Sequence, residues 1–361
     1  MRLPFTFKLG CSILALFAVA CKRDNPTPPE PTRPIAYTTV STLAGNGISG
    51  STNGPGNTAQ FAGPEGLAMD AQGNIFVADN GNNCIRKVTP AGVVSTYAGT
   101  GTAGLVNGPA STAQFFGPID VAIDGQGNLL VAEYANNCIR KITPAGIVST
   151  LAGTGTAGFA DGGAAAAKFN HPNGLAVDAQ GVLYVADYDN YRIRRILPSG
   201  DVSTVAGSGQ RGSADGPAAS AQFVGPEGLA VDAAGTLYVA DFAGYRIRKI
   251  TAAGTVSTVA GTGTRGFSDG AGAGAQFNGP AGVAIDSRGD LFVADAGNAC
   301  VRRISVADGT VSTVAGSRTP GFADGPVATA QFYVPLGIAA GPAGVLYLGE
   351  GSDRIRKIAA Q

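Results

Sequence analysis

The feature that most constrains this chain is an internal repeat of 54 residues that occurs six times. Strings of the type Val-Ala-Asp end in an acidic residue at regular steps: Asp79, Glu133, Asp187, Asp241, Asp295 and Glu350. An Ile/Val-Arg-Lys/Arg string follows each of them and places its arginine at Arg86, Arg140, Arg194, Arg248, Arg302 and Arg356. Thr38 to Gln361 is 324 residues long, which equals six repeats. We therefore expect no second folded domain within residues 38–361.

Each unit holds four short runs that are typical of β-strands. In the first unit they lie, in order, at residues 66–70, 75–79, 84–88 and 93–98. The second run is almost wholly apolar, as expected for a strand covered on both faces. The fourth places Ser and Thr between apolar residues, as expected for an outer strand that is wet on one side. Turn sequences such as Thr89-Pro90-Ala91-Gly92 separate the runs.

Units of four antiparallel strands bury two faces each only when they pack radially. This predicts an all-β fold, a six-bladed β-propeller of four-stranded antiparallel blades. The blades are expected at about 64–99, 118–153, 172–207, 226–261, 280–316 and 335–358. The last unit stops after its third strand, and its missing fourth strand matches Thr39–Gly45 near the other end of the chain. We therefore expect residues 38–45 to complete the last blade as its outer edge and to close the ring.

The repeat resembles the NHL repeat. The fullest match runs from Pro172-Asn173-Gly174-Leu175-Ala176-Val177-Asp178 through Val185-Ala186-Asp187 to Arg192-Ile193-Arg194-Arg195-Ile196. The resemblance covers all six units and implies a six-bladed propeller. It does not select an activity, because such propellers serve as binding platforms and as enzymes alike.

Residues 1–20 have the pattern of an export signal. Basic Arg2 and Lys8 precede an apolar run that is too short to span a bilayer comfortably. The run ends in Ala18-Val19-Ala20-Cys21, which resembles a bacterial lipobox and implies cleavage before Cys21 and its lipidation. An ordinary secretory signal is the alternative. Residues 21–37 are proline-rich and are expected to form an extended tether. The propeller is therefore predicted to be lipid-anchored and extracytoplasmic, in a bacterial cell envelope.

Charge and glycine patterns argue against several functions. Lys+Arg and Asp+Glu are both 25, so no net charge attracts nucleic acid, and we expect membrane contact through the lipid anchor alone. The six repeated arginines are required in every blade, so we interpret them as structural partners of carboxylates or carbonyls. Gly-x-Gly-x-x-Gly strings, such as the one that begins at Gly45, follow an outer strand and open no helix. We interpret them as connector turns rather than dinucleotide sites.

The connectors between units carry three further repeated residue types. Each ends in a phenylalanine that is expected to pack between neighbouring blades: Phe61, Phe115, Phe169, Phe223, Phe277 and Phe332. Each also holds an Asp or Asn that we expect to bond to its own turn, a calcium loop being the minor alternative: Asn53, Asn107, Asp161, Asp215, Asp269 and Asp324. Cys84, Cys138 and Cys300 stand at equivalent positions of different blades, too far apart for disulfides. We expect them to be buried, free thiols.

The start of the innermost strand differs between blades. A residue that is present in all six blades cannot mark a single site, so we expect functional residues at positions that differ. Four polar residues are predicted to lie at one mouth of the central channel: Glu65, Asp120, Asn173 and Glu227. His171, the single histidine, is expected near them. Oxygen ligands that converge on an axial channel suit Ca²⁺, which is the one cofactor that the pattern suggests. Asn173-Gly174-Leu175 also resembles a segment of gluconolactonase-like propellers, in which such strands bind a divalent metal.

The loop after the second strand is the second variable region. In blades two to four it carries Tyr134, Tyr188, Asp189, Tyr191, Phe242 and Tyr245. Aromatic side chains on the loops of a rigid scaffold suit recognition of a peptide or a glycan. The predicted ligand-binding residues are therefore Tyr134, Tyr188, Asp189, Phe242 and His171. For Tyr191 and Tyr245, packing between strands is an equal alternative.

These patterns predict a binding module for a protein, peptide or glycan ligand in the envelope or outside the cell. The alternative is a Ca²⁺-dependent hydrolase, lactonase or lyase with its site at the mouth of the channel. No catalytic residue is assigned, because the sequence shows no Ser/His/Asp or Cys/His set for acyl transfer. The balance of these observations leans against an enzyme.

Overall fold

The computed structural model describes residues 1, 3, 4, 6 and 35–360, and the propeller begins after Pro34. Cys21, most of the predicted export signal and most of the predicted tether lie outside the described residues. None of the helices in the described part of the chain is long and apolar enough to cross a membrane.

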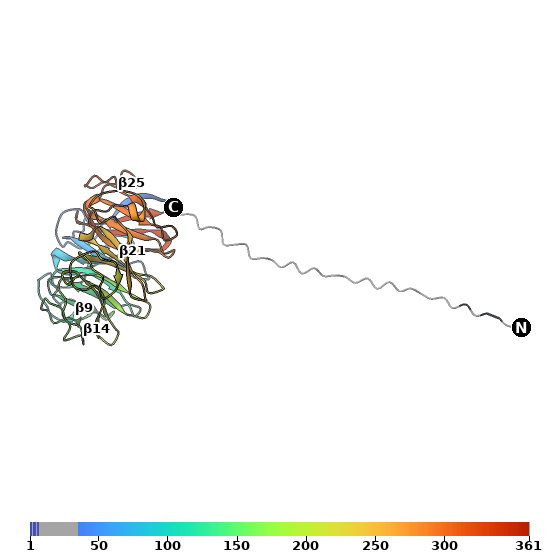
Figure 1. Ribbon diagram of the computed structural model, residues 1–361. Helices are drawn as coiled ribbons and strands as arrows, with labels where there is room; N and C mark the ends of the chain where they lie inside the picture. Colours follow the sequence, from blue (N-terminus) through green and yellow to red (C-terminus); the bar gives the residue numbers. More distant parts are fainter. Residues whose placement is uncertain (2, 5, 7–34, 361) are drawn as a thin grey trace. The chain divides into compact units, whose positions relative to one another are not determined.

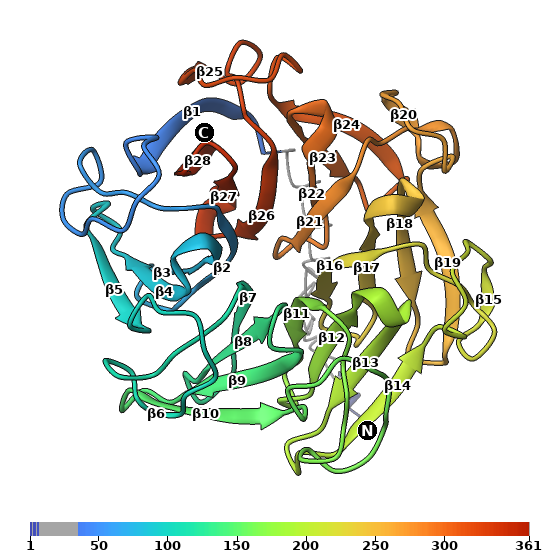
Figure 2. The ribbon, with the colours of Figure 1, turned by 90° about the vertical axis from the view of Figure 1, so that its left-hand side faces the viewer.

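Six antiparallel sheets surround a central channel, one sheet for each repeat (Figures 1 and 2). Each begins at the channel with a strand whose first residue is proline: β2 (Pro64–Met69), β7 (Pro118–Ile123), β11 (Pro172–Val177), β16 (Pro226–Val231), β21 (Pro280–Ile285) and β26 (Pro335–Ala340). The second strands are nearly all buried, as their apolar sequences predict: β3 (Ile75–Asp79), β8 (Leu129–Glu133), β12 (Leu183–Asp187), β17 (Leu237–Asp241), β22 (Leu291–Asp295) and β27 (Leu346–Glu350).

The third and fourth strands continue each blade outward. The third strands are β4 (Cys84–Val88), β9 (Cys138–Ile142), β13 (Arg192–Ile196), β18 (Arg246–Ile250), β23 (Cys300–Ile304) and β28 (Arg354–Ala360). The fourth strands are β5 (Val94–Ala98), β10 (Ile147–Ala152), β14 (Val202–Ala206), β19 (Thr255–Ala260), β24 (Thr310–Ala315) and β1 (Tyr37–Ala44). The all-β, six-bladed fold predicted from the repeat is thus confirmed.

Strand β1 closes the ring. It pairs antiparallel with β28, with Val40 opposite Ile358 and Ser41 opposite Lys357. Figure 2 shows this blue strand beside the red strands of the last blade. The predicted closure is confirmed, and the strand begins at Tyr37, one residue before the expected segment.

The fourth strand is not the bare outer edge that the sequence predicted. In four blades a two-residue strand from the connector pairs outside it: β6 (Gly108–Pro109), β15 (Gly216–Pro217), β20 (Gly270–Ala271) and β25 (Gly325–Pro326). Single bridges from Gly54 to Val94 and from Gly162 to Val202 do the same in the other two blades. The long connectors therefore satisfy backbone groups of the outer strand that would otherwise face water.

A buried arginine lies at the centre of each blade. Arg194 donates to Asp187 Oδ2 at 2.7 Å and to Asp161 Oδ1 at 2.5 Å, and its guanidinium lies 5.2 Å from the centre of the Phe169 ring. The equivalent arginines of the other five blades are also fully buried, as are all six connector phenylalanines. The interpretation of both residue types as structural is confirmed, and these arginines form no exposed cationic belt.

The connector Asp and Asn residues have a different role from the one predicted. Asp161, Asp215, Asp269 and Asp324 pair with the buried arginine of their own blade, and the amide oxygens of Asn53 and Asn107 accept from it at 2.8 and 2.7 Å. The expectation of bonding within their own turns missed this partner, because the arginine lies about 33 residues further along the chain. Each carboxylate or amide thereby links a connector to the third strand.

Three thiols are enclosed by the blades. Cys84, Cys138 and Cys300 are buried and free, as the sequence predicted from their positions in different blades. Each is the first residue of a third strand, where blades three, four and six have an arginine. Burial raises the pKa of the Cys84 and Cys138 thiols to about 12.

Candidate functional site

The two variable regions that the sequence analysis treated separately lie at the same end of the propeller. In the first blade Pro64, which starts the inner strand, is paired with Asp79, which ends the second strand. The loop after the second strand therefore projects at the end where the inner strand begins. This register recurs in every blade. We call this end the loop mouth of the channel.

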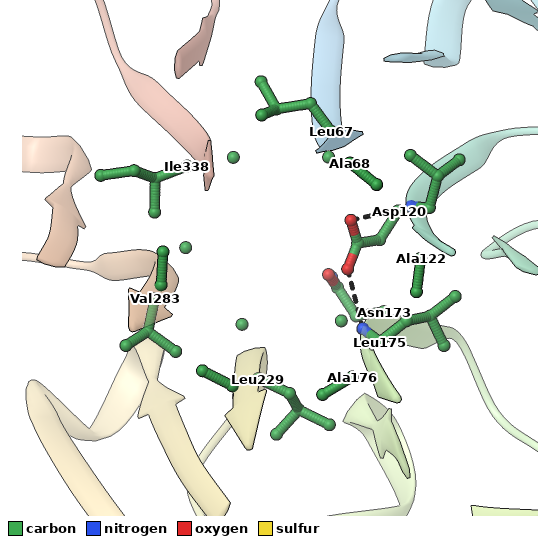
Figure 3. Close-up of a pocket in the computed structure, with 18 of the residues that line it drawn as sticks. Leu67, Ala68, Asp120, Ala122, Asn173, Leu175, Ala176, Leu229, Val283 and Ile338 are labelled. Carbon is green, nitrogen blue, oxygen red and sulfur yellow. Dashed lines mark hydrogen bonds between the residues drawn. The ribbon is translucent and has the colours of Figure 1, made fainter. Parts of the chain in front are cut away.

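The channel forms a cavity of about 330 Å³ that opens among the inner strands (Figure 3). Four blades contribute polar side chains to its wall, and they are the predicted ones: Glu65, Asp120, Asn173 and Glu227. The remaining two blades contribute Ala281 and Leu336 at the corresponding positions. The wall is therefore polar over blades one to four and apolar over blades five and six.

Asp120 occupies a position that is glycine in the other five blades. At Gly174, for example, a Cβ atom would lie 2.1 Å from the carbonyl oxygen of Glu227, which is too close for a side chain. In blade two the register shift lies between Pro118 and Asp120, so Asp120 is paired with Ala132, whereas in blade one the shift extends over the equivalent glycine, from Pro64 to Leu67. A substitution of this kind in one blade of six marks a local departure from the repeat.

The Asp120 carboxylate joins two blades inside the channel. It accepts the backbone N–H of Val121 at 2.8 Å and that of Leu175, in the next blade, at 2.7 Å (Figure 3). Burial nevertheless raises the pKa of Asp120 to about 7, against the effect of these two donors.

Glu65 and Glu227 face the channel from opposite blades, because blades one and four lie across the ring from each other (Figure 2). Burial and the nearby Asp120 raise the pKa of Glu65 to about 7, and burial and Glu65 raise that of Glu227 to about 8. No Lys, Arg or His is among the described residues that line this cavity. These acidic groups therefore lack the cationic partner that the carboxylates within each blade possess.

An arc of aromatic rings borders the same mouth. Tyr134 stacks on His171 of the next blade, with ring centres 4.1 Å apart and an angle of 10° between the planes. Tyr188 and Phe242 occupy similar places in the next two blades. The residue equivalent to His171 is a glycine there, and Tyr188 lies against Gly225 and Phe242 against Gly279. We call Tyr134, Tyr188 and Phe242 the aromatic arc.

One further contact and one electrostatic effect involve the aromatic arc and nearby acidic groups. His171 Nδ1 lies 2.5 Å from Asp189 Oδ2, and both side chains remain about one-third exposed. The pKa of Tyr188 is raised by burial and then by the negative charge of Glu227. The five predicted ligand-binding residues and the two channel glutamates thus lie at the same end of the propeller, although the sequence analysis had treated them as two separate regions.

Tyr191 and Tyr245 are positioned by the backbone. Each follows a short 3-10 turn, η2 (Tyr188–Asn190) or η3 (Phe242–Gly244), in the left-handed conformation with φ of 54° or 53°. In blade two the same position holds Asn137, whose side-chain oxygen accepts the backbone N–H of His171 at 2.9 Å. In blade two this position therefore connects the loop after the second strand to the next blade.

Sequence reasoning missed three exposed side chains beside the inner strands. Phe116, Tyr333 and Val334 are 46%, 50% and 38% exposed. They lie between the buried connector phenylalanine and the proline that starts the inner strand, so they too are at the loop mouth. The sequence does contain a signal for Phe116 and Tyr333, because the residue after the connector phenylalanine is not aromatic in the other blades: Ala62, Asn170, Val224 and Asn278.

The metal hypothesis stays a prediction. Within residues 35–360, no three His, Cys, Asp or Glu side chains lie close enough together to share a metal ion. Oxygen donors of the kind that Ca²⁺ prefers are present in Glu65, Asp120, Asn173 and Glu227. A calcium ion bound at the channel mouth would therefore need ligands other than a set of three carboxylates.

Known proteins resemble parts of this chain. Residues 61–88, 169–196 and 277–304 match the NHL repeat. The protein SUPPRESSOR OF QUENCHING 1, chloroplastic, of Arabidopsis thaliana is 30% identical over 301 residues, which cover 75% of this chain and 28% of that protein. Teneurin-3 of Mus musculus is 29% identical over 222 residues, which cover 54% of this chain and 8% of that protein. The chain spans less than a third of the length of these curated relatives.

Solved structures share the fold at low identity. A Bacteroides thetaiotaomicron protein of unknown function superimposes with a TM-score of 0.71 at 19% identity, covering 90% of this chain and 76% of that one. An auxiliary nutrient binding protein from Bacteroides ovatus gives 0.69 at 19% identity, covering 90% and 77%. A streptogramin B lyase gives 0.56 at 12% identity, covering 90% and 98%. With its six blades and three matched repeats, the chain is a six-bladed β-propeller that carries NHL repeats.

Proposed function

We propose that this protein is an extracytoplasmic, lipid-anchored binding module that captures a peptide or glycan ligand at the loop mouth of its propeller. The observation that carries the proposal is the aromatic arc beside Glu65 and Glu227, which is confined to four blades of a ring that is otherwise repetitive. Partly exposed aromatic rings supply large, rigid contact area at low entropic cost.

The acidic groups of the mouth favour a cationic ligand, because a positively charged group beside them would stabilise their ionised form. The described wall of the mouth has carboxyl groups from blades one, two and four and no basic side chain, while blades five and six offer apolar surface. A ligand with a positively charged group and an apolar portion complements both halves. Aromatic faces also attract cations, at about 0.5 to 2 kcal/mol for each contact.

The solved structures described as nutrient-binding support a binding role, since they share this fold over 90% of the chain. The lipid anchor rests on the Ala18-Val19-Ala20-Cys21 string. It is tested by mass spectrometry of the protein purified from bacterial membranes: a diacylglyceryl group on Cys21 is expected, and an unmodified chain cleaved elsewhere would contradict the anchor.

Ligand capture is tested with the mature protein on peptide and glycan arrays and with envelope extracts. The variant Tyr134→Ala/Tyr188→Ala/Phe242→Ala should lose capture at least tenfold, because it removes the aromatic arc and leaves the blades intact. Phe159→Ala is the matched control, since Phe159 is an exposed aromatic residue on a connector over Arg192. Undiminished capture by the triple variant would refute the site.

A hydrolase or lyase at the same mouth is the second candidate function. It is favoured by the raised pKa values of Glu65, Asp120 and Glu227, which place proton transfer by these carboxyls near neutral pH. A Ca²⁺ titration followed by thermal melting separates the two functions. A bound ion raises the melting temperature by mass action and a chelator reverses the effect, whereas identical melts with Ca²⁺ and with chelator would remove the metal-dependent enzyme.

A further inference from the structure

Blade two lacks an aromatic side chain that every other blade has. The second residue of the second strand is aromatic in five blades: Phe76, Tyr184, Tyr238, Phe292 and Tyr347. In blade two the same position holds Leu130. Like Asp120, this residue departs from the repeat at a single place, and its side chain is not part of the loop mouth.

In the other blades this ring fills the space against the next blade. Phe76 is 6% exposed and belongs to the same cluster as Leu129 and Ile142 of blade two. Phe292 is fully buried beside Leu346 and Ile358 of the last blade. The ring is thus one of the side chains that seal neighbouring blades together.

A basic residue accompanies the ring across the strands. Phe76 is paired with Lys87, whose ammonium nitrogen lies 5.7 Å from the ring centre. The register places Lys141 opposite Leu130 in blade two. In the described part of the chain, no ion pair or hydrogen bond engages the Lys141 ammonium. Blade two therefore keeps the cation and lacks the ring.

A cavity of about 370 Å³ lies at this point, between blades two and three. Leu130, Lys141, Leu183 and Ile196 line it. Leu183 and Ile196 are the blade-three equivalents of Leu129 and Ile142, which pack with Phe76 one blade earlier. The turns at Asp124–Gln126 and Ala179–Gly181 also border the cavity, so it opens on the face opposite the loop mouth.

The acidic group at the rim is already satisfied. Asp124 Oδ1 accepts the backbone N–H of Gln126 and of Asn128, each at 2.9 Å, and Asp124 Oδ2 accepts the side-chain amide of Asn128 at 2.7 Å. Its carboxylate is therefore held within its own turn. The remaining charged group on the wall is the Lys141 ammonium.

We propose that this cavity binds a small aromatic carboxylate. The aromatic ring occupies the place of the side chain that blade two lacks, against Leu130, Leu183 and Ile196, and the carboxylate pairs with the Lys141 ammonium. Apolar cavities left by a missing ring bind free aromatic molecules, and a charge-assisted hydrogen bond adds selectivity for an anion. This site is separate from the proposed peptide or glycan site.

The probe for the test is phenylacetate, titrated into the mature protein by calorimetry and by protein-observed NMR, with neutral phenylacetamide as its uncharged counterpart. A ligand of this size is expected to bind with a Kd of about 1 mM or below. Leu130→Phe should weaken phenylacetate binding at least tenfold, because the new ring fills the cavity. Lys141→Met should weaken phenylacetate about tenfold and leave phenylacetamide nearly unchanged.

Matched controls separate the site from general effects. Lys249→Met makes the same change in blade four, where Tyr238 fills the equivalent place, and should leave phenylacetate binding unchanged. Circular dichroism checks that each variant folds, and Leu130→Tyr replaces Leu130→Phe if that variant does not. Binding that survives the folded ring substitution, or no saturable binding below about 10 mM, overturns the proposal. The aromatic-arc variant should bind phenylacetate normally, which distinguishes this site from the loop mouth.

Discussion

Thr42 and Asp324 are 282 positions apart in the chain, yet the backbone N–H of Thr42 donates to Asp324 Oδ2 at 3.0 Å. Asp324 also pairs with the buried Arg356, so strand β1 is joined to the last blade by its backbone pairing and by this side-chain network. The closure of the ring thus depends on residues from both ends of the propeller.

Deletion of residues 38–45 should lower the melting temperature of the mature protein by about 10 °C or more. The deletion removes the buried Val40 and Ala44 and all of the outer pairing of β28 except Tyr37 with Ala360. Several kcal/mol lost from a domain of this size correspond to a shift of that order. Deletion of residues 22–34, which precede the propeller, is the control and should leave the melt unchanged. A deletion of 38–45 with an unaltered melt would show that closure does not stabilise the ring.

Replacing a buried blade arginine should be far more costly than replacing its neighbour. Arg194→Ala leaves the buried Asp187 without its partner and is expected to lower the free energy of unfolding by about 3 to 5 kcal/mol. Arg195 is exposed and donates to Ser203 Oγ at 2.9 Å, so Arg195→Ala should change that free energy by less than about 1 kcal/mol. Urea unfolding of both variants provides the comparison, and equal losses would contradict the structural role of Arg194.

Much of this fold could be predicted because the six repeats can be compared with one another within a single sequence. Six occurrences of one pattern distinguish residues that every blade needs, such as Arg194 and Phe169, from those that vary. The same comparison also predicted that Glu65 and Glu227 lie at the channel. Closure followed from counting strands, because the last unit lacked one.

Contacts between distant segments could not be predicted in the same way. The connector Asp161 binds Arg194, although its sequence is equally typical of a local turn. Tyr188 and Glu227 lie at the same end of the propeller because of the pairing register, which places the loop after the second strand beside the start of the inner strand. The gap beside Leu130 required coordinates, because a leucine in a strand is not unusual until the space around it is known.

The blade thiols should be inert in the native state. Burial raises the pKa of Cys84 and Cys138 to about 12, so the reactive thiolate is rare at pH 8, and both side chains are inaccessible. Iodoacetamide treatment at pH 8 followed by peptide mass spectrometry should find Cys84, Cys138 and Cys300 unmodified before unfolding and fully modified in urea. Rapid labelling of Cys138 in the folded protein would contradict the enclosed position.

The channel carboxyls should make the protein less stable as the pH rises. The pKa of Glu227 is about 8 in the native state against an ordinary value of 4.5, so the native state holds a proton that the unfolded chain releases between these two pH values. The contribution of this bound proton to the free energy of unfolding is fully present below pH 4.5 and is lost as the pH rises through 8. Glu65, with a native pKa of about 7, adds to the same trend.

Glu227→Gln removes the titrating group and keeps the shape of the side chain. We expect the variant to exceed the wild type in free energy of unfolding by about 1 to 3 kcal/mol at pH 9 and to match it near pH 4.5, where Glu227 is protonated in the native state. Urea unfolding at half-unit steps of pH measures both curves, and the low-pH agreement serves as the internal control. A difference that is constant across this range would mean that packing, rather than the charge facing the channel, sets the effect. A variant that is less stable at pH 9 would mean that the Glu227 carboxylate has a cationic partner, which would remove the charge argument for the ligand of the loop mouth.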